Sequence, residues 1–107
     1  MCFFRKRKKR KEVKIKTSDK LIIERLETDE DDYILKLVNK MIEGNPLILN
    51  FDLLHIDHAN KVLAFITGVV YAIDGYYQFI NDNIYLFGNK DLYTDNSIKN
   101  WIEENIN

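Results

Sequence analysis

The middle of the chain holds an almost wholly apolar run, Leu47-Ile48-Leu49-Asn50-Phe51, and residues with helical spacing lie on both sides of it. A strand with this composition is typical of a sheet that is covered on both faces. Apolar residues recur at helical spacing from 34 to 42 and again from 59 to 70. We therefore predict a buried central strand with two helices packed on its sheet.

Three further segments complete the predicted architecture. Residues 21–23 indicate a short buried strand, and residues 76–80 and 84–87 flank the polar turn 81–83, which predicts a β-hairpin. The tail, 97–106, places four apolar residues on one helical face: Ile98, Trp101, Ile102 and Ile106. The order β-α-β-α-β-β-α predicts an α/β fold of the α+β sandwich type. In it, two helices pack on a small mixed sheet that ends in a hairpin, and a C-terminal amphipathic helix follows.

Residues that start and stop helices mark where the predicted helices end. Thr28, followed by four acidic residues, predicts the start of the first helix, because capping oxygens and negative charges are favourable there. Gly44 and Pro46 predict its end. Asp57 is expected to cap the second helix and Gly75 to end it.

The hairpin carries large side chains on both of its faces. Tyr76 and Ile80 lie on one side of the first strand, and Tyr77 and Phe79 lie on the other. Two helices cover only one face of a sheet, so the second face is expected to meet the C-terminal helix or another subunit. Because large aromatic patches are seldom left in water on a monomer, we predict a homodimer.

Charge divides the chain into two predicted parts, a basic arm over residues 1–20 and a core domain over residues 21–107. The arm has ten Lys or Arg and two acidic residues, and Arg5 to Lys11 are all basic; the core has six bases and fifteen acids. Cys2 is the only cysteine, so no intrachain disulfide forms, as expected in a reducing cytosol. No apolar run approaches the ~20 residues of a membrane span. We predict a cytosolic protein.

Candidate catalytic and metal-binding residues are few. His55 and His58 flank Asp57, but a helix cap accounts for Asp57 and no thiolate or third histidine joins them, so we expect no metal. The chain has no Gly-rich phosphate loop and no nucleophile–base set with suitable spacing. We expect neither a cofactor nor enzymatic activity. The aromatic hairpin could stack bases, but packing in a core or dimer explains it more simply.

From Gly44 to Leu92 the sequence resembles the SepF family of cell-division proteins. The resemblance lies in a helix that ends at Gly44, the apolar strand 47–51 and the closing segment Val70-Tyr71-Ala72-Ile73-Asp74-Gly75. The family's Ala, basic residue and Phe-x-x-Gly are matched by Ala59, Lys61, Phe65 and Gly68, and its last strand by Ile84-Tyr85-Leu86. Three departures are present: Asn89 and Ala64 stand where the family usually has Pro and Asp, and residues 1–20 replace an amphipathic helix and long acidic linker.

The resemblance implies a role in cell division and septum assembly. It implies an adaptor that binds the C-terminal peptide of the tubulin-like protein FtsZ, organises the Z-ring and links FtsZ filaments to the inner membrane at the division site. The residues matched to the family's contact region are Ala59, Lys61, Phe65 and Tyr85. Self-assembly, as a dimer and a higher polymer, is assigned to Gly68 together with Tyr77 and Phe79 of the hairpin.

The basic arm has two alternative interpretations besides a solvated tail. An apolar tip followed by a polybasic stretch is a two-signal membrane anchor, and each base near an anionic surface contributes ~1 kcal/mol. The membrane residues would be Phe3, Phe4, Arg5, Lys6, Arg7, Lys8, Lys9, Arg10 and Lys11. The alternative is a small nucleic-acid-associated protein that binds phosphates through the same bases. We favour the membrane, because nucleic acid does not explain the apolar tip.

Overall fold

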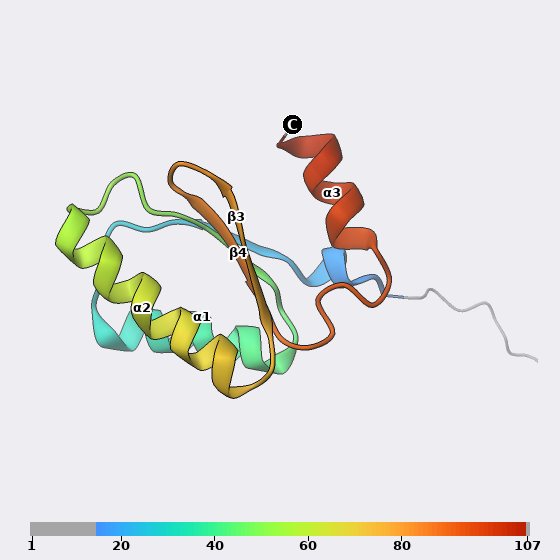
Figure 1. Ribbon diagram of the computed structural model, residues 1–107, viewed down its shortest axis with the longest axis horizontal. Coiled ribbons are helices and arrows are strands. Elements are labelled where there is room, and N and C mark those ends of the chain that lie inside the picture. Colours follow the sequence, from blue (N-terminus) through green and yellow to red (C-terminus); the bar gives the residue numbers. More distant parts are fainter. Residues whose placement is uncertain (1–14, 107) are drawn as a thin grey trace, which may run out of the picture.

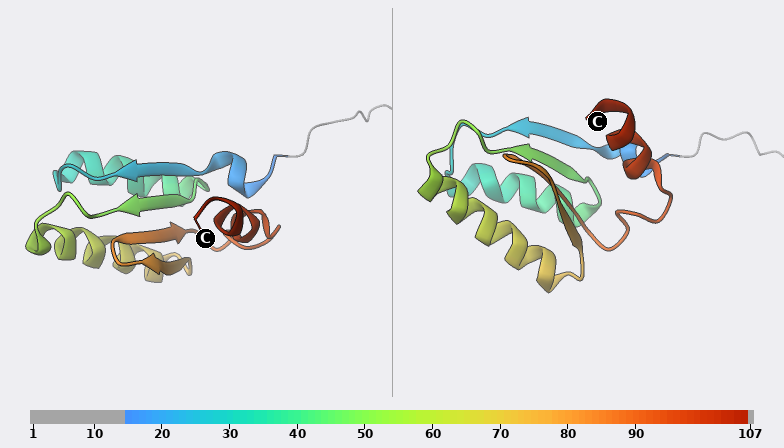
Figure 2. Two further views of the ribbon diagram at one scale, coloured as in Figure 1. Left: turned by 90° about the horizontal axis from the view of Figure 1, so that it is seen from above. Right: turned by 45° about the horizontal axis from the view of Figure 1, so that its top comes forward.

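A computed structural model describes residues 15–106 and shows a four-stranded mixed sheet between two layers of helix (Figure 1). Two helices, α1 and α2, cover one face of the sheet, and α3 packs on the other, as the views in Figure 2 show. In chain order the elements are the 3-10 helix η2 (Thr17–Lys20), β1 (Ile22–Arg25), α1 (Asp31–Glu43), β2 (Leu47–Asn50), α2 (Ile56–Ala72), β3 (Tyr76–Asn81), β4 (Ile84–Gly88) and α3 (Ser97–Asn105). The predicted α+β architecture is confirmed.

The strands lie in the order β1-β2-β4-β3, so that β2 and β4 are central. β1 runs parallel to β2, and the other pairs are antiparallel. Leu47, Ile48 and Leu49 of β2 are all buried, as expected for a strand covered on both faces. The expectation of a buried first strand was wrong. β1 is an edge strand that starts one residue later, and Ile23, on the face that α1 and α2 do not cover, is 56% exposed.

Each face of the sheet has its own apolar core. The larger core joins α1, α2 and the sheet, with Met41, Leu49, Ile66 and Phe87 among its fully buried members. The second core joins the opposite sheet face to α3 and the loop before it: Ile48, Leu86, Leu92, Ile98 and Ile102. The C-terminal helix therefore covers the part of the second face over β2 and β4, which was one of the two alternatives that the hairpin pattern left open.

Several helix ends differ from the predicted ones. α1 begins at Asp31, and its N-cap is Glu30, with no side-chain capping bond. Thr28 lies before the cap, and its hydroxyl accepts a hydrogen bond from the backbone N–H of Glu30. The prediction that Asp57 caps α2 was wrong: His55 is the N-cap, and its Nδ1 accepts from the backbone N–H of Asp57.

The two predicted helix-ending glycines differ in their roles. Gly44 ends α1 in the left-handed conformation, at a φ of 114°, as predicted. After α2 the left-handed residue is Asp74, and the N–H of Gly75 bonds the carbonyl of Val70, as in a Schellman motif. Position 75 requires glycine because no side chain fits there: a Cβ would lie 2.3 Å from the backbone oxygen of Gly88.

Candidate functional site

The N-terminal halves of α1 and α2 lie side by side and leave a groove of about 320 Å³ between them. The apolar lining comes from both helices: Ile34 and Leu35 from α1, Val62 and Phe65 from α2. Phe65 is the aromatic residue of this lining, and 43% of it is exposed. The groove therefore offers an apolar wall to a partner segment.

Charged side chains meet beside this apolar wall. Lys61 Nζ lies 3.5 Å from Asp29 Oδ2 and 3.9 Å from Asp31 Oδ1, and all three residues line the groove. His58 Nδ1 lies 2.7 Å from the same oxygen of Asp29. The hydrogen bond with His58 is the largest cause that holds the pKa of Asp29 below its usual range, and Lys61 acts in the same direction. The groove therefore has both acidic and basic side chains beside its apolar wall.

The structure separates the four residues matched to the family's contact region into two pairs. Lys61 and Phe65 line the groove. Ala59 and Tyr85 are partly buried and pack against the larger core. The Tyr85 ring contacts Phe51 edge-on, with ring centroids 5.8 Å apart, and stacks on Phe87 at 6.1 Å. Of the four, the groove therefore contains only Lys61 and Phe65, and its other lining residues are Val62 of α2, Asp29 and residues of α1.

Comparison with known proteins agrees with this architecture. The family described as Cell division protein SepF matches residues 27–89, which is more than half of the chain. The chain belongs to the SepF family. It is a cell-division protein of that family, and the matched segment runs from just before α1 to just after β4. The groove between α1 and α2 lies wholly inside it.

Curated relatives carry the same family name. The chain is 33% identical to cell division protein SepF 2 of Desulforamulus reducens, over 60% of this chain and 45% of the relative. It is 30% identical to cell division protein SepF of Lactobacillus helveticus, over 66% and 49%, and 26% identical to that of Finegoldia magna, over 65% and 44%. The chain spans about half the length of the curated relatives it matches.

The residues assigned to self-assembly are all exposed in the SepF-family chain. Gly68 lies on the outward face of α2, and a Cβ added there would meet nothing within 4 Å. Close packing of α2 on its own sheet therefore does not explain this mid-helix glycine. Tyr77 and Phe79 lie on the edge strand β3, and each is more than half exposed. Nearby, Tyr71 of α2 is 87% exposed.

The predicted membrane residues, 3–11, lie outside the described part of the chain. Within residues 15–106, no helix combines the length and the apolar content that a membrane span needs. The same range contains no cluster of three or more His, Cys, Asp or Glu side chains arranged to hold a metal ion.

Sequence reasoning missed two sets of residues that the structure brings together. Asp29 and Asp31 were expected only to favour a helix start, whereas they also pair with Lys61 across the groove. Asp95 was not singled out, yet its carboxylate binds both Thr17 and Ser97. The pattern Asp95-Asn96-Ser97 before an apolar helical face is a visible helix-start signature. The contact with Thr17 spans 78 residues and has no local signature.

Proposed function

We propose that this SepF-family chain is a non-enzymatic adaptor that binds the C-terminal peptide of FtsZ in the groove between α1 and α2. Its basic arm would link that peptide, and with it the FtsZ filament, to the cytoplasmic face of the inner membrane at the division site. The observation that carries the proposal is the groove itself, where the exposed part of Phe65 and the Lys61 charge cluster lie together. Both residues match the contact region that the family resemblance implies.

An apolar peptide segment gains most where it covers Phe65 and Leu35, which are the exposed apolar residues of the lining. Lys61 would exchange one of its bonds with Asp29 or Asp31 for a carboxylate of the peptide, so that the charge stays paired. This exchange matters because a charge left unpaired at a desolvated contact costs far more than an exposed pair contributes. The groove thus supplies the two kinds of contact that a short peptide anchor needs.

Self-association belongs to the same proposal. A homodimer that covers Gly68, Tyr77 or Phe79 would remove from water the aromatic surface that the chain leaves exposed on α2 and β3. Dimerisation also doubles the number of grooves and basic arms per particle, and such linkage raises the overall avidity for a filament and a membrane. The acidic balance of residues 21–107 makes the core a poor ligand for nucleic acid.

A synthetic peptide with the C-terminal sequence of FtsZ from the same genome tests the groove. We expect Lys61→Glu to weaken peptide binding at least tenfold in a titration, with the melting temperature almost unchanged, because the side chain is well exposed. Lys40→Glu is the matched control: it makes the same charge change on an exposed face of α1, outside the groove lining. Equal affinity of the two variants would move the peptide site away from the groove.

Deletion of residues 1–12 tests the arm. We expect the truncated chain to lose binding to vesicles that contain anionic lipid and to keep peptide binding, because the described core begins after the deleted segment. Co-sedimentation with the vesicles at physiological salt measures this. A shift of labelled DNA that disappears with the same deletion, without vesicle binding by the full chain, would support the nucleic-acid alternative instead.

A further inference from the structure

The last part of the basic arm, at Thr17 and Ser18, is held on the core by a group of hydrogen bonds centred on Asp95. Its Oδ2 accepts from the backbone N–H of Thr17 at 2.9 Å and from the Thr17 hydroxyl at 3.1 Å. Its Oδ1 accepts from the backbone N–H and the hydroxyl of Ser97, at 3.0 and 2.7 Å. The backbone N–H of Ser18 donates to Ser97 Oγ at 2.9 Å. We call Thr17, Ser18, Asp95 and Ser97 the clasp.

The clasp ties segments that are far apart in sequence. Hydrogen bonds to an ionised carboxylate are roughly twice as strong as neutral ones, and Asp95 accepts four of them. These donors, the backbone N–H of Thr17 first among them, hold the pKa of Asp95 far below its usual range. Ser97 is buried, and η2 packs against α3. Residues 17–20 are thus part of the folded unit rather than a free tether.

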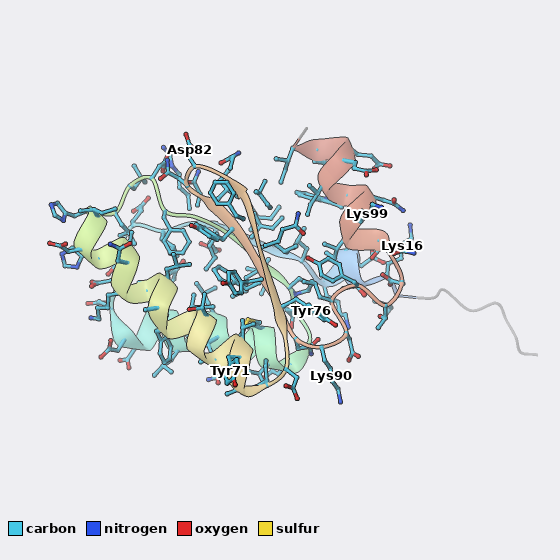
Figure 3. The ribbon with its side chains drawn as sticks, in the orientation of Figure 1. Lys16, Tyr71, Tyr76, Asp82, Lys90 and Lys99 are labelled. Carbon is cyan, nitrogen blue, oxygen red and sulfur yellow. The ribbon has the colours of Figure 1, made fainter. Side chains whose placement is uncertain are left out.

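The clasp and the groove lie at opposite ends of the domain. Figures 1 and 2 show α3 and the blue 3-10 helix η2 at one end and the starts of α1 and α2 at the other. α2, with its 17 residues, is about 26 Å long, and the groove lies along its first half. Lys16 and Lys99 lie at the α3 end, as labelled in Figure 3.

Charge also differs between the two ends. The groove end carries a dense set of acids at the two helix starts: Asp29, Glu30, Asp31, Asp32 and Asp57. The other end is mixed in charge, with three lysines, Lys16, Lys20 and Lys99, near four acids, Asp19, Asp95, Glu103 and Glu104. An anionic surface therefore repels the groove end more strongly than the α3 end. The position of the clasp and the distribution of charge therefore favour the same orientation.

We infer that the clasp fixes the point at which the arm leaves the core, and that it thereby makes the α3 end of the domain the surface that faces an anionic bilayer. The groove, at the opposite end, is directed away from the lipid and toward a filament. This inference rests on the membrane binding in the proposed function. The length of the folded domain then separates the groove from the end that faces the bilayer.

Trp101 gives a built-in probe, because it is the only tryptophan of the chain and it lies on α3 beside Ser18 and Asp95. Full-length protein is added to vesicles of phosphatidylcholine and phosphatidylglycerol that contain a dansyl-labelled lipid, and energy transfer from tryptophan to dansyl is measured. The comparison protein carries Trp101→Phe together with Leu53→Trp, which moves the probe to an exposed loop before α2. We expect at least twofold greater transfer from Trp101 than from position 53.

Asp95→Ala opens the clasp, and Asp91→Ala is its matched control, since it removes one exposed carboxylate from the same loop. We expect the difference between the two probes to shrink by at least half in Asp95→Ala and to persist in Asp91→Ala, with equal co-sedimentation. Equal transfer from both probes in the protein with an intact clasp would overturn the inference, even if Asp95→Ala failed to fold. Failure of the unaltered protein to sediment with vesicles would instead overturn the proposed membrane binding, and the orientation with it.

Discussion

Replacement of Phe65 by Ala tests the groove most directly, and the structure sets the size of the effect. A Phe side chain covers roughly 200 Å², and 43% of Phe65 is exposed, so a peptide that covers it removes ~85 Å² of apolar surface from water. At ~25 cal/mol per Å² this contributes about 2 kcal/mol. The truncation should therefore weaken binding of the FtsZ peptide about thirtyfold.

The assay is a titration of labelled peptide by fluorescence anisotropy at 25 °C, with circular dichroism to confirm that each variant is folded. Phe65→Ala also removes the buried part of the ring, so its melting temperature should fall by several degrees. Tyr71→Ala is the matched control: it truncates an aromatic residue on the same helix, outside the groove lining and almost fully exposed. It should leave the peptide affinity unchanged. A folded Phe65→Ala protein with less than a threefold loss of affinity would refute the reasoning.

Three further predictions concern glycine and the clasp. Gly68→Ala should raise the free energy of unfolding by ~1 kcal/mol in denaturant melts, because the added Cβ meets nothing. Gly68→Lys should shift sedimentation toward the monomer. If the sedimentation of Gly68→Lys is unchanged, Gly68 does not lie in the interface. Gly75→Ala should instead destabilise the fold by ~1–3 kcal/mol, since its Cβ would press on the carbonyl of Gly88, and a neutral result would contradict the packing of β3 on β4. Asp95 has a lowered pKa in the folded state, so its contribution to the stability of the fold is complete above the unfolded pKa of ~4. That contribution is lost as the pH falls through the folded pKa. The melting temperature of the unaltered protein should therefore exceed that of Asp95→Asn by a constant amount from pH 7 to 5, and by less only below pH ~4.

The layers of the fold could be predicted because local patterns coincide with long-range structure. The run 47–51 is apolar on both faces since β2 is central, and the polar turn 81–83 separates two strands that pair with each other. Gly44 adopts the left-handed conformation that its place after α1 requires. In each case the residue types that satisfy the backbone locally are the same ones that the sheet and its helices need.

The cap of α2 and the first strand were predicted wrongly for a physical reason that they share. His55 and Asp57 both carry an acceptor near the helix start, and composition alone favours the carboxylate, but the chain entering from β2 puts the His55 ring next to the free N–H. Ile23 is as apolar as Ile22. Only the strand order shows that β1 lies at the edge of the sheet, where the side chain of Ile23 is left exposed. The N-cap of α2 and the exposure of Ile23 depend on where these residues lie in the tertiary structure, which a short stretch of sequence does not determine.

The groove and the clasp both depend on contacts between distant segments. Lys61 becomes part of a site only because the acids that begin α1 lie beside it, and those acids alone would be read as helix-start charges. Thr17 becomes fixed only because Asp95, 78 residues later, accepts its N–H and hydroxyl. The first contact gives α2 a polar rim for a peptide, and the second gives the arm a defined origin. The proposed adaptor, with a filament on one side and a membrane on the other, requires both contacts, since a groove without a fixed arm would face the lipid as readily as the filament.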